Sequence, residues 1–474
     1  MKKIGHYIIN LLIWTLFFAA FWARNTYGNF TGDELFFHLL VPLGGISTQS
    51  FSSLAIEVFL PGVILGFISA FIIDHYFSKQ KKFINVILLI IVLLIDFYKI
   101  NLFTYLANQI QQSDFIENNY VETKDVKLTF PENKKNLIYI YLESMENTYT
   151  NKKKGGSNNQ SLTPTLTKLT KEHTSFSNTT HQGGALSLNG TAWTAAAMVG
   201  QTSGLPLKIN LSSNGIIDLN NFFPNTKTLG DILQENGYSN YLLLGSDSNY
   251  GCRKQYFEKH GNYKIYDLNT ALEEKAMTED DIVWWGFDDD DLFTKAKEQL
   301  TEIAKSKEPF NYTMLTVDTH FEDGYLAKTC EKKYADQYSN VISCADSKIA
   351  AFLTWLQTQD FYDDTVVILV GDHLSMDTDY FKDLPKDYTR TIYNVIINSS
   401  ATTKYTTNRK FSTLDMFPTT LAALGVNIEN DRLALGTNLY SKEKTLIEQK
   451  GYKYVLNELD KRSTFYNNNV LAYK

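Results

Sequence analysis

The stretch "NLIYIYLE", residues 136–143, is an apolar run that ends on one carboxylate, Glu143. A short run rich in Ile, Leu and Tyr, bounded by polar residues on both sides, is typical of a buried strand. A charge at the end of such a strand costs free energy unless an opposite charge or hydrogen-bond donors compensate it. The stretch therefore predicts a central strand whose carboxyl end faces a compensating group.

Two later stretches repeat this pattern of an apolar strand followed by polar residues. "FNYTMLTV" (310–317) is followed closely by His320, and "TVVILVG" (365–371) is followed directly by Asp372 and His373. The helical patterns and helix–strand units between the strands cover residues 162–173, 226–245, 334–357 and 413–425. This alternation predicts an α/β domain with a largely parallel sheet and helices on both faces. Ligands of such sheets bind beyond the carboxyl ends of the strands.

The first 107 residues have a different composition. Three long apolar runs occupy Ile4–Ala23, about 54–77 and about 83–106. Each run is long enough to cross a hydrocarbon core of roughly 30 Å as a helix. The basic stretches "MKK" and "KQKK" (79–82) flank these runs on one side, so the positive-inside rule places both in the cytoplasm. The sequence predicts a multi-pass cell-membrane protein with three transmembrane helices in 1–107 and an extracellular remainder.

The remainder divides into three predicted parts: a polar juxtamembrane connector at 108–135, the α/β domain at 136–440 and a C-terminal tail at 441–474. A chain of 474 residues with 44% hydrophobic residues is long and apolar enough for folded domains and excludes disorder. The net charge of −7 does not suit a nucleic-acid partner, and none is predicted.

Three cysteines lie in the predicted extracellular part, where disulfides are stable. Cys330 and Cys344 are 14 residues apart and can close a short loop, which leaves Cys252 unpaired. Spacing alone does not decide between this bond and free thiols.

A carboxylate at one strand end and an Asp-His pair at another are the ligands of a divalent metal ion. Glu143, Asp372 and His373 supply hard oxygen ligands and one imidazole, a combination that suits Mn²⁺ or Mg²⁺. Mn²⁺ is the preferred prediction, and Mg²⁺ is the alternative.

A nucleophile is expected near the metal. The Gly- and Ser-rich segment 183–207 runs into an Ala-rich helix, and Thr191 stands at the predicted helix start, where an anion such as phosphate is favoured. Thr191 therefore suits either a nucleophilic role or the role of an N-cap. Thr194 competes for the same role.

The motifs taken in order resemble one known family. "NLIYIYLES", the Gly-Thr pair before a helix, "DTHFEDGY", "GDH" and "TLDMFPTTLAALG" are similar to the motifs of the phosphoglycerol transferases, which include lipoteichoic acid synthase. That family forms part of the sulfatase-like branch of the alkaline phosphatase superfamily. The resemblance covers about residues 108–440, and "RLALGTNL" with "EDGYLAKTC" look closer to the members that modify glycans. The expected fold is thus a set of N-terminal transmembrane helices followed by an extracellular sulfatase-like α/β domain.

The resemblance also implies roles for the site residues. The family's metal ligands correspond to Glu143, Thr191, Asp372 and His373. Thr191 doubles as the nucleophile in this assignment. His320 matches a histidine that contacts the glycerophosphate group, and Arg253 fits the position of a phosphate-binding arginine.

The implied reaction is metal-dependent transfer of glycerol phosphate from phosphatidylglycerol, through a phospho-threonine intermediate. The implied acceptor is a cell-surface glycan or a teichoic acid (polyglycerolphosphate) chain. Two alternatives remain open at this point: a phosphoethanolamine transferase, which also uses a threonine, and a non-catalytic relative that binds glycan or lipid. The complete set of candidate ligands favours an enzyme over the non-catalytic alternative.

Overall fold

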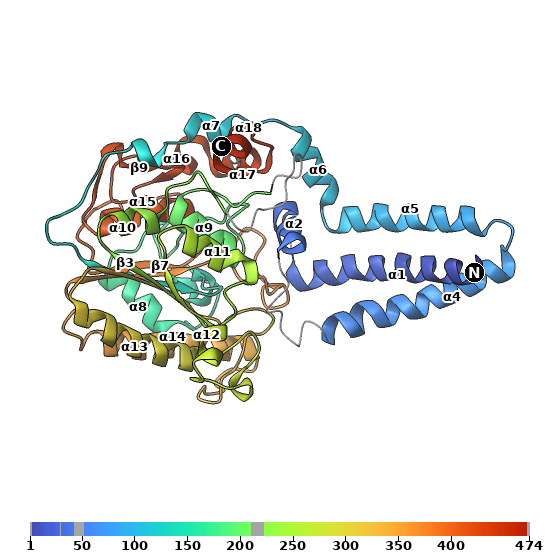
Figure 1. Ribbon diagram of the computed structural model, residues 1–474, viewed down its shortest axis with the longest axis horizontal. Helices are drawn as coiled ribbons and strands as arrows, with labels where there is room; N and C mark the ends of the chain where they lie inside the picture. The colour runs from blue at the N-terminus through green and yellow to red at the C-terminus, as the bar shows by residue number, and fades with distance from the viewer. Residues whose placement is uncertain (1, 29, 42–51, 210–221, 472–474) are drawn as a thin grey trace.

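The computed structural model describes residues 2–28, 30–41, 52–209 and 222–471. Long N-terminal helices project from one side of an α/β domain (Figure 1). The short helix α2 (Gly32–Leu40) lies between the two parts, next to the end of α1 (Lys2–Tyr27).

The projecting helices are α1, α4 (Leu60–Tyr76) and α5 (Lys81–Lys99), which run alongside one another (Figure 1). A π-helical segment, η1 (Leu54–Phe59), leads directly into α4. Many of their large apolar side chains are exposed, which is expected of helices that face lipid.

Two of these helical stretches, Ile4–Tyr27 and Leu54–Tyr76, are long and apolar enough to cross a membrane. The third predicted span is not one straight helix. It consists of α5 and α6 (Leu102–Ile110), which are bent by 76° relative to each other and form a span only if counted together. The break falls at Asn101, whose backbone is left-handed with φ 56°, a conformation that an α-helix cannot contain. A count of three spans thus depends on this bent pair.

The α/β domain contains a six-stranded sheet with the order β4-β3-β5-β2-β6-β7. Its strands are β2 (Asn136–Leu142), β3 (Ser239–Leu244), β4 (Lys264–Tyr266), β5 (Phe310–Leu315), β6 (Thr365–Gly371) and β7 (Asn394–Ile397). All neighbouring strands are parallel except β6 and β7. The predicted largely parallel sheet is confirmed, and β2 has the bounds that the opening stretch predicts.

Alternate side chains of β2 enter the two cores on either side of the sheet. Tyr139 and Tyr141 lie in one core, and Ile138 and Ile140 lie in the other. Helices cover both faces (Figure 1). The first core holds α9 (Thr194–Ser203), α10 (Leu229–Glu235) and α15 (Met416–Ala423), and the second holds α8 (Pro164–Glu172), α13 (Asp289–Ile303) and α14 (Gln337–Leu356).

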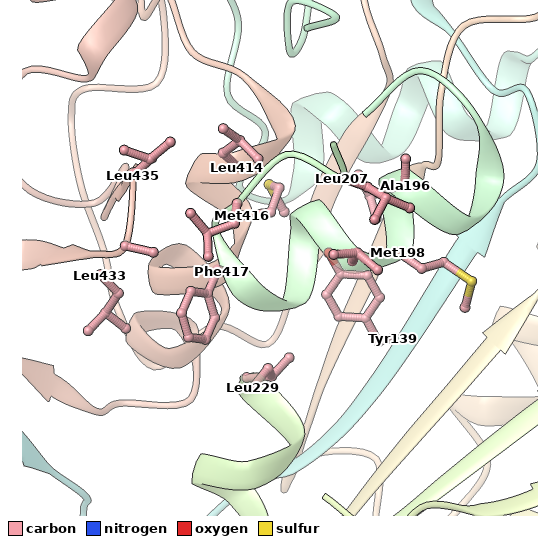
Figure 2. Close-up of a cluster of buried hydrophobic side chains, with 14 of the residues drawn as sticks. Tyr139, Ala196, Met198, Leu207, Leu229, Leu414, Met416, Phe417, Leu433 and Leu435 are labelled. Atoms are coloured by element: carbon pink, nitrogen blue, oxygen red, sulfur yellow. The ribbon is translucent and has the colours of Figure 1, made fainter. Parts of the chain in front are cut away.

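The first core explains the Ala-rich composition of α9. Every residue of α9 after Thr194 is buried, and Ala196 and Met198 belong to the same hydrophobic cluster as Tyr139 of β2 and Phe417 of α15 (Figure 2). Small side chains allow the helix to lie close to both neighbours. This packing fixes the first residue of α9 above the ends of the central strands.

Shorter elements complete the domain. They are α7 (Phe115–Asn119), α11 (Arg253–Lys259), α12 (Leu268–Glu273), α16 (Leu446–Lys450), α17 (Tyr452–Asp460), α18 (Thr464–Tyr466), and the paired strands β1 (Leu128–Thr129) with β8 (Asn427–Ile428) and β9 (Arg432–Leu433) with β10 (Gly436–Thr437). Residues 446–471, within the predicted C-terminal tail, are thus largely helical, and Leu459 and Tyr466 are buried in the first core.

The cysteine pairing left open by the sequence is resolved. Cys330 and Cys344 form a disulfide with a Cα–Cα distance of 5.5 Å, and Cys252 is a buried free thiol. The bond joins the loop after β5 to the first half of α14.

Candidate active site

The candidate site lies where β2 and β6 end side by side in the middle of the sheet. Leu142 of β2 pairs with Gly371 of β6, so Glu143 and Asp372 follow at the same level. The ligand atoms of Glu143, Asp372 and His373 all lie within 4.8 Å of one another, and all three residues are buried. We call these three residues the strand-end cluster. The parallel sheet brings together three of the four predicted metal ligands.

The turn after β2 holds both carboxylates in place. Ser144, in the left-handed region with φ 53°, donates from its backbone N to Asp372 Oδ1 (2.8 Å) and from Oγ to Glu143 Oε1 (2.7 Å). The other oxygen of Asp372, Oδ2, is buried and has no hydrogen bond among the described residues. It lies 3.3 Å from His373 Nε2.

The charges of the strand-end cluster fit a divalent cation. Burial and the nearby Glu143 carboxylate raise the pKa of Asp372 to about 7, which shows that negative charge is crowded here. His373 Nδ1 lies 2.8 Å from the carbonyl oxygen of Leu374, which can only accept, so Nδ1 carries the proton and the lone pair of Nε2 is available to a ligand. Two carboxylates, one with an unsatisfied oxygen, and an imidazole nitrogen form a suitable donor set.

Thr194 is the hydroxyl residue in contact with the strand-end cluster. Its Oγ1 lies 3.4 Å from Glu143 Oε2 and 3.3 Å from His373 Nε2. It is the first residue of α9, where free backbone N–H groups and the helix dipole favour negative charge. This position suits a nucleophile that attacks a phosphate group.

Thr191, the sequence-based choice for this role, lies elsewhere. Its hydroxyl donates to the carbonyl oxygen of Leu188 at 2.8 Å, and its methyl group faces Gly200 of α9. Thr191 is fully buried and closes the turn that contains Gly190, whose φ is +79°. The helix begins three residues later than the sequence predicts, so the geometry reverses the order of the two candidates in favour of Thr194.

Arg253, at the start of α11, lines the same pocket as Thr194 and Glu143. Its guanidinium donates to the carbonyl oxygens of Tyr250 (2.9 Å) and Asp247 (2.6 Å) and to Ser246 Oγ (3.1 Å). These bonds hold a buried cation beside the pocket, where it can bind the oxygens of a phosphate group.

His320 follows β5 and also lines the pocket. Burial lowers its pKa to about 4, so the ring is neutral at pH 7. Its Nδ1 lies 2.6 Å from the carbonyl oxygen of Phe321, so Nδ1 carries the hydrogen and Nε2 is free to accept one. The ring packs against Trp285 with 4.9 Å between centroids.

The pocket includes walls that the sequence did not indicate. Glu34 and His38 of α2 and Tyr27 of α1 lie on it, together with Trp193 and Trp285. The N-terminal residues carry no motif that predicts this placement. The only sequence signal is the acidic, amphipathic character of the segment between the first two apolar runs.

Comparison with known proteins agrees with the fold. Residues 135–426, more than half of the chain, match the Sulfatase family, and the chain belongs to this family. The sulfatase-like family expected from the motifs is thereby confirmed.

The curated relatives are more specific. Phosphoglycerol transferase I of Escherichia coli strain 55989 is 32% identical over 343 residues, which cover 68% of this chain and 43% of that protein. The chain therefore spans less than half the length of the curated relatives it matches.

Two solved structures share the fold. Lipoteichoic acid synthase LtaP from Listeria monocytogenes is 21% identical, covers 70% of this chain and 82% of its own, and has a TM-score of 0.52. The integral membrane lipooligosaccharide phosphoethanolamine transferase A (EptA) from Neisseria meningitidis is 15% identical, covers 89% of this chain and 84% of its own, and has a TM-score of 0.54. The second match is long enough to include part of the N-terminal helices.

Proposed function

We propose that the protein transfers glycerol phosphate from phosphatidylglycerol to a cell-surface glycan or teichoic acid acceptor. The observation that carries this proposal is the contact of the Thr194 hydroxyl with Glu143 and His373, at 3.4 and 3.3 Å. The similarity to phosphoglycerol transferase I supports glycerol phosphate as the transferred group. The basic stretches that flank the apolar runs support an extracellular site, where such acceptors occur.

Thr194 is the proposed nucleophile. In the first step, a bond forms between Thr194 Oγ1 and phosphorus, the bond from phosphorus to the diacylglycerol oxygen breaks, and that oxygen takes the proton that Thr194 loses. In the second step, the acceptor hydroxyl oxygen bonds to phosphorus, the bond to Oγ1 breaks, and Thr194 regains a proton from the acceptor. Two easier steps replace one difficult displacement.

Arg253 and His320 assist both steps. Arg253 neutralises charge on the phosphate oxygens, and such electrostatic stabilisation, together with positioning, provides most of the rate enhancement in phosphoryl transfer. His320 Nε2, which is neutral and lines the same pocket, is placed to carry the proton between the acceptor and Thr194.

Glu143, Asp372 and His373 would hold the metal ion, with Thr194 beside them. When bound, a divalent ion lowers the pKa of a nearby hydroxyl and neutralises charge on the phosphate. Mn²⁺ suits a site of two carboxylates and one imidazole, and Mg²⁺ suits the oxygen ligands alone.

The test is the intact mass of the full chain, loaded with Mn²⁺, after incubation with phosphatidylglycerol vesicles. We expect a glycerophosphate adduct and release of diacylglycerol, both absent in Thr194→Ala. Thr191→Ala is the matched control, because Thr191 lies in the same segment but bonds only to its own turn. We expect Thr191→Ala to keep the adduct.

Three results contradict this proposal. An adduct that survives in Thr194→Ala and disappears in Thr191→Ala restores the sequence-based assignment. An ethanolamine phosphate adduct, formed from phosphatidylethanolamine and not from phosphatidylglycerol, would show that phosphatidylethanolamine is the donor. Absence of any adduct with the metal bound excludes the covalent mechanism.

A further inference from the structure

Helix α2 joins the first two membrane helices in the chain and is docked firmly on the α/β domain. Asp33 Oδ1 accepts a hydrogen bond from the backbone N of Ile209 at 2.8 Å. Phe37 is fully buried and lies 5.7 Å from the ring of Trp193, the residue before Thr194. These contacts fix the side chains of α2 relative to the nucleophile.

One face of α2 closes the active-site pocket. His38 stacks on Tyr250 at a centroid distance of 6.1 Å, and Glu34 lines the pocket together with Thr194 and Arg253. Tyr27, at the end of α1, lines it as well. The pocket therefore lies at the end of α1, one of the helices that are long and apolar enough to cross a membrane.

Glu34 is the third residue of α2, and its side chain forms a capping box with Thr31. Its exposed fraction is only 4%. Among the described residues, the hydrogen-bond donor to this carboxylate is the backbone N of Thr31, at a long 3.4 Å. A buried carboxylate with spare acceptor capacity, aimed into a pocket, is suited to bind the donor groups of a ligand.

We propose that Glu34 recognises the glycerol headgroup of the lipid donor by accepting hydrogen bonds from its hydroxyl groups. This inference rests on the proposed function and adds the residue that selects the headgroup. Arg253 and Thr194 take the phosphate, and Glu34 lies on the wall of the same pocket that α2 forms, so the uncharged end of the headgroup faces α2. A segment of the N-terminal membrane region thereby sets the specificity of the extracellular site.

The test compares two donors in vesicles: phosphatidylglycerol, and phosphatidylpropanol, which has a headgroup of the same length without free hydroxyls. Diacylglycerol release and adduct formation on Thr194 are measured for the full chain loaded with Mn²⁺. We expect the wild type to prefer phosphatidylglycerol in kcat/KM by about tenfold to a hundredfold, the usual effect of hydrogen bonds to a charged group.

We expect Glu34→Ala to reduce this preference to within about twofold, mainly through a lower kcat/KM for phosphatidylglycerol. Glu34→Gln retains an acceptor oxygen and should keep an intermediate preference. Asp33→Asn is the matched control, because Asp33 lies on the same helix but bonds to Ile209. It should lower thermal stability and leave the donor preference unchanged.

Each other outcome overturns the inference. If Glu34→Ala keeps the wild-type preference while the Thr194 adduct forms, the proposed function stands and Glu34 does not read the headgroup. If Glu34→Ala lowers kcat/KM equally with both donors, Glu34 supports the fold and does not determine donor selectivity. If the wild type forms no adduct with either lipid, the proposed function fails, and this inference fails with it.

Discussion

Two groups of buried carboxylates lie at the ends of neighbouring strands of the same sheet, and they are neutralised differently. Asp318, which follows β5, and Asp289, the first residue of α13, face Lys348 of α14, whose Nζ lies 2.8 Å from Asp318 Oδ2. We call these three residues the lysine-bridged cluster. After β2 and β6, the strand-end cluster has two carboxylates and a histidine, and Asp372 Oδ2 has no hydrogen bond among the described residues.

The difference shows how to tell a structural acidic cluster from a metal site. In the lysine-bridged cluster the carboxylates also accept backbone hydrogen bonds, for example from Val317 N to Asp289 Oδ1 at 2.8 Å. Charge and hydrogen bonds are both supplied by the chain. In the strand-end cluster the chain supplies less than full neutralisation, which leaves the place that a cation would fill.

The largest expected effect is the loss of activity in Glu143→Gln. Removal of one carboxylate from the strand-end cluster should lower diacylglycerol release by about a thousandfold, because several kcal/mol of stabilisation by the metal are lost. The free energy of unfolding without metal should change by less than about 1 kcal/mol, since Gln keeps an acceptor for Ser144 Oγ. Kinetics and thermal melting of the metal-free protein check both parts. A large loss of stability would mean that the strand-end cluster stabilises the fold in the same way as the lysine-bridged cluster.

Lys348→Met should have the opposite effect, a large loss of stability with a smaller loss of activity. It leaves Asp318 and Asp289 buried without their cation, and we expect the protein to lose about 3–5 kcal/mol of stability, measured by denaturant unfolding. Asp318→Asn combined with Lys348→Met removes both charges and should recover part of the loss. If Lys348→Met unfolds at the wild-type denaturant concentration, the comparison between the clusters is wrong.

Metal binding should distinguish the clusters directly. Mn²⁺ at a hundred times its Kd should stabilise the metal-free wild type by about 2.7 kcal/mol, seen as a higher melting temperature. We expect the same shift in Lys348→Met and no shift in Asp372→Asn, because only the second variant loses a ligand of the strand-end cluster. A shift that depends on Lys348 would point to a cation in the other cluster.

The smallest expected effect is a pH dependence of stability in the lysine-bridged cluster. Burial raises the pKa of Asp318 from 3.8 to about 6, against the opposing effect of Lys348. Between pH 5 and 7 the unfolded carboxyl is already ionised while the folded one still binds a proton at pH 5. Stability should therefore fall by about 1 kcal/mol as the pH rises from 5 to 7. The difference in unfolding free energy between wild type and Asp318→Asn checks this, since Asn does not titrate.

Much of the fold follows from the sequence because its signals are local. The apolar runs at 136–142 and 365–371 are strands with those bounds, and the parallel order then sets Glu143 beside Asp372 and His373. The third membrane span is predicted less well, since hydropathy does not detect the break at Asn101.

The choice between Thr191 and Thr194 shows the limit within the site. Thr191 lies just before the Ala-rich helix and Thr194 begins it. The exact first residue of a helix cannot be assigned from sequence. The packing of α9 against β2 and α15 fixes that start at Thr194. The three-residue shift decides which hydroxyl faces the strand-end cluster.

The sequence by itself determined the strands, the residues at their ends and hence the family, because strand periodicity and polar strand ends are properties of neighbouring residues. The tertiary structure alone decided which threonine meets the strand-end cluster, that Lys348 neutralises one acidic group, and that Glu34 lies in the pocket. Those facts depend on segments that are far apart in the chain. Only the packed core and the docking of α2 bring them together, and no local pattern encodes that contact.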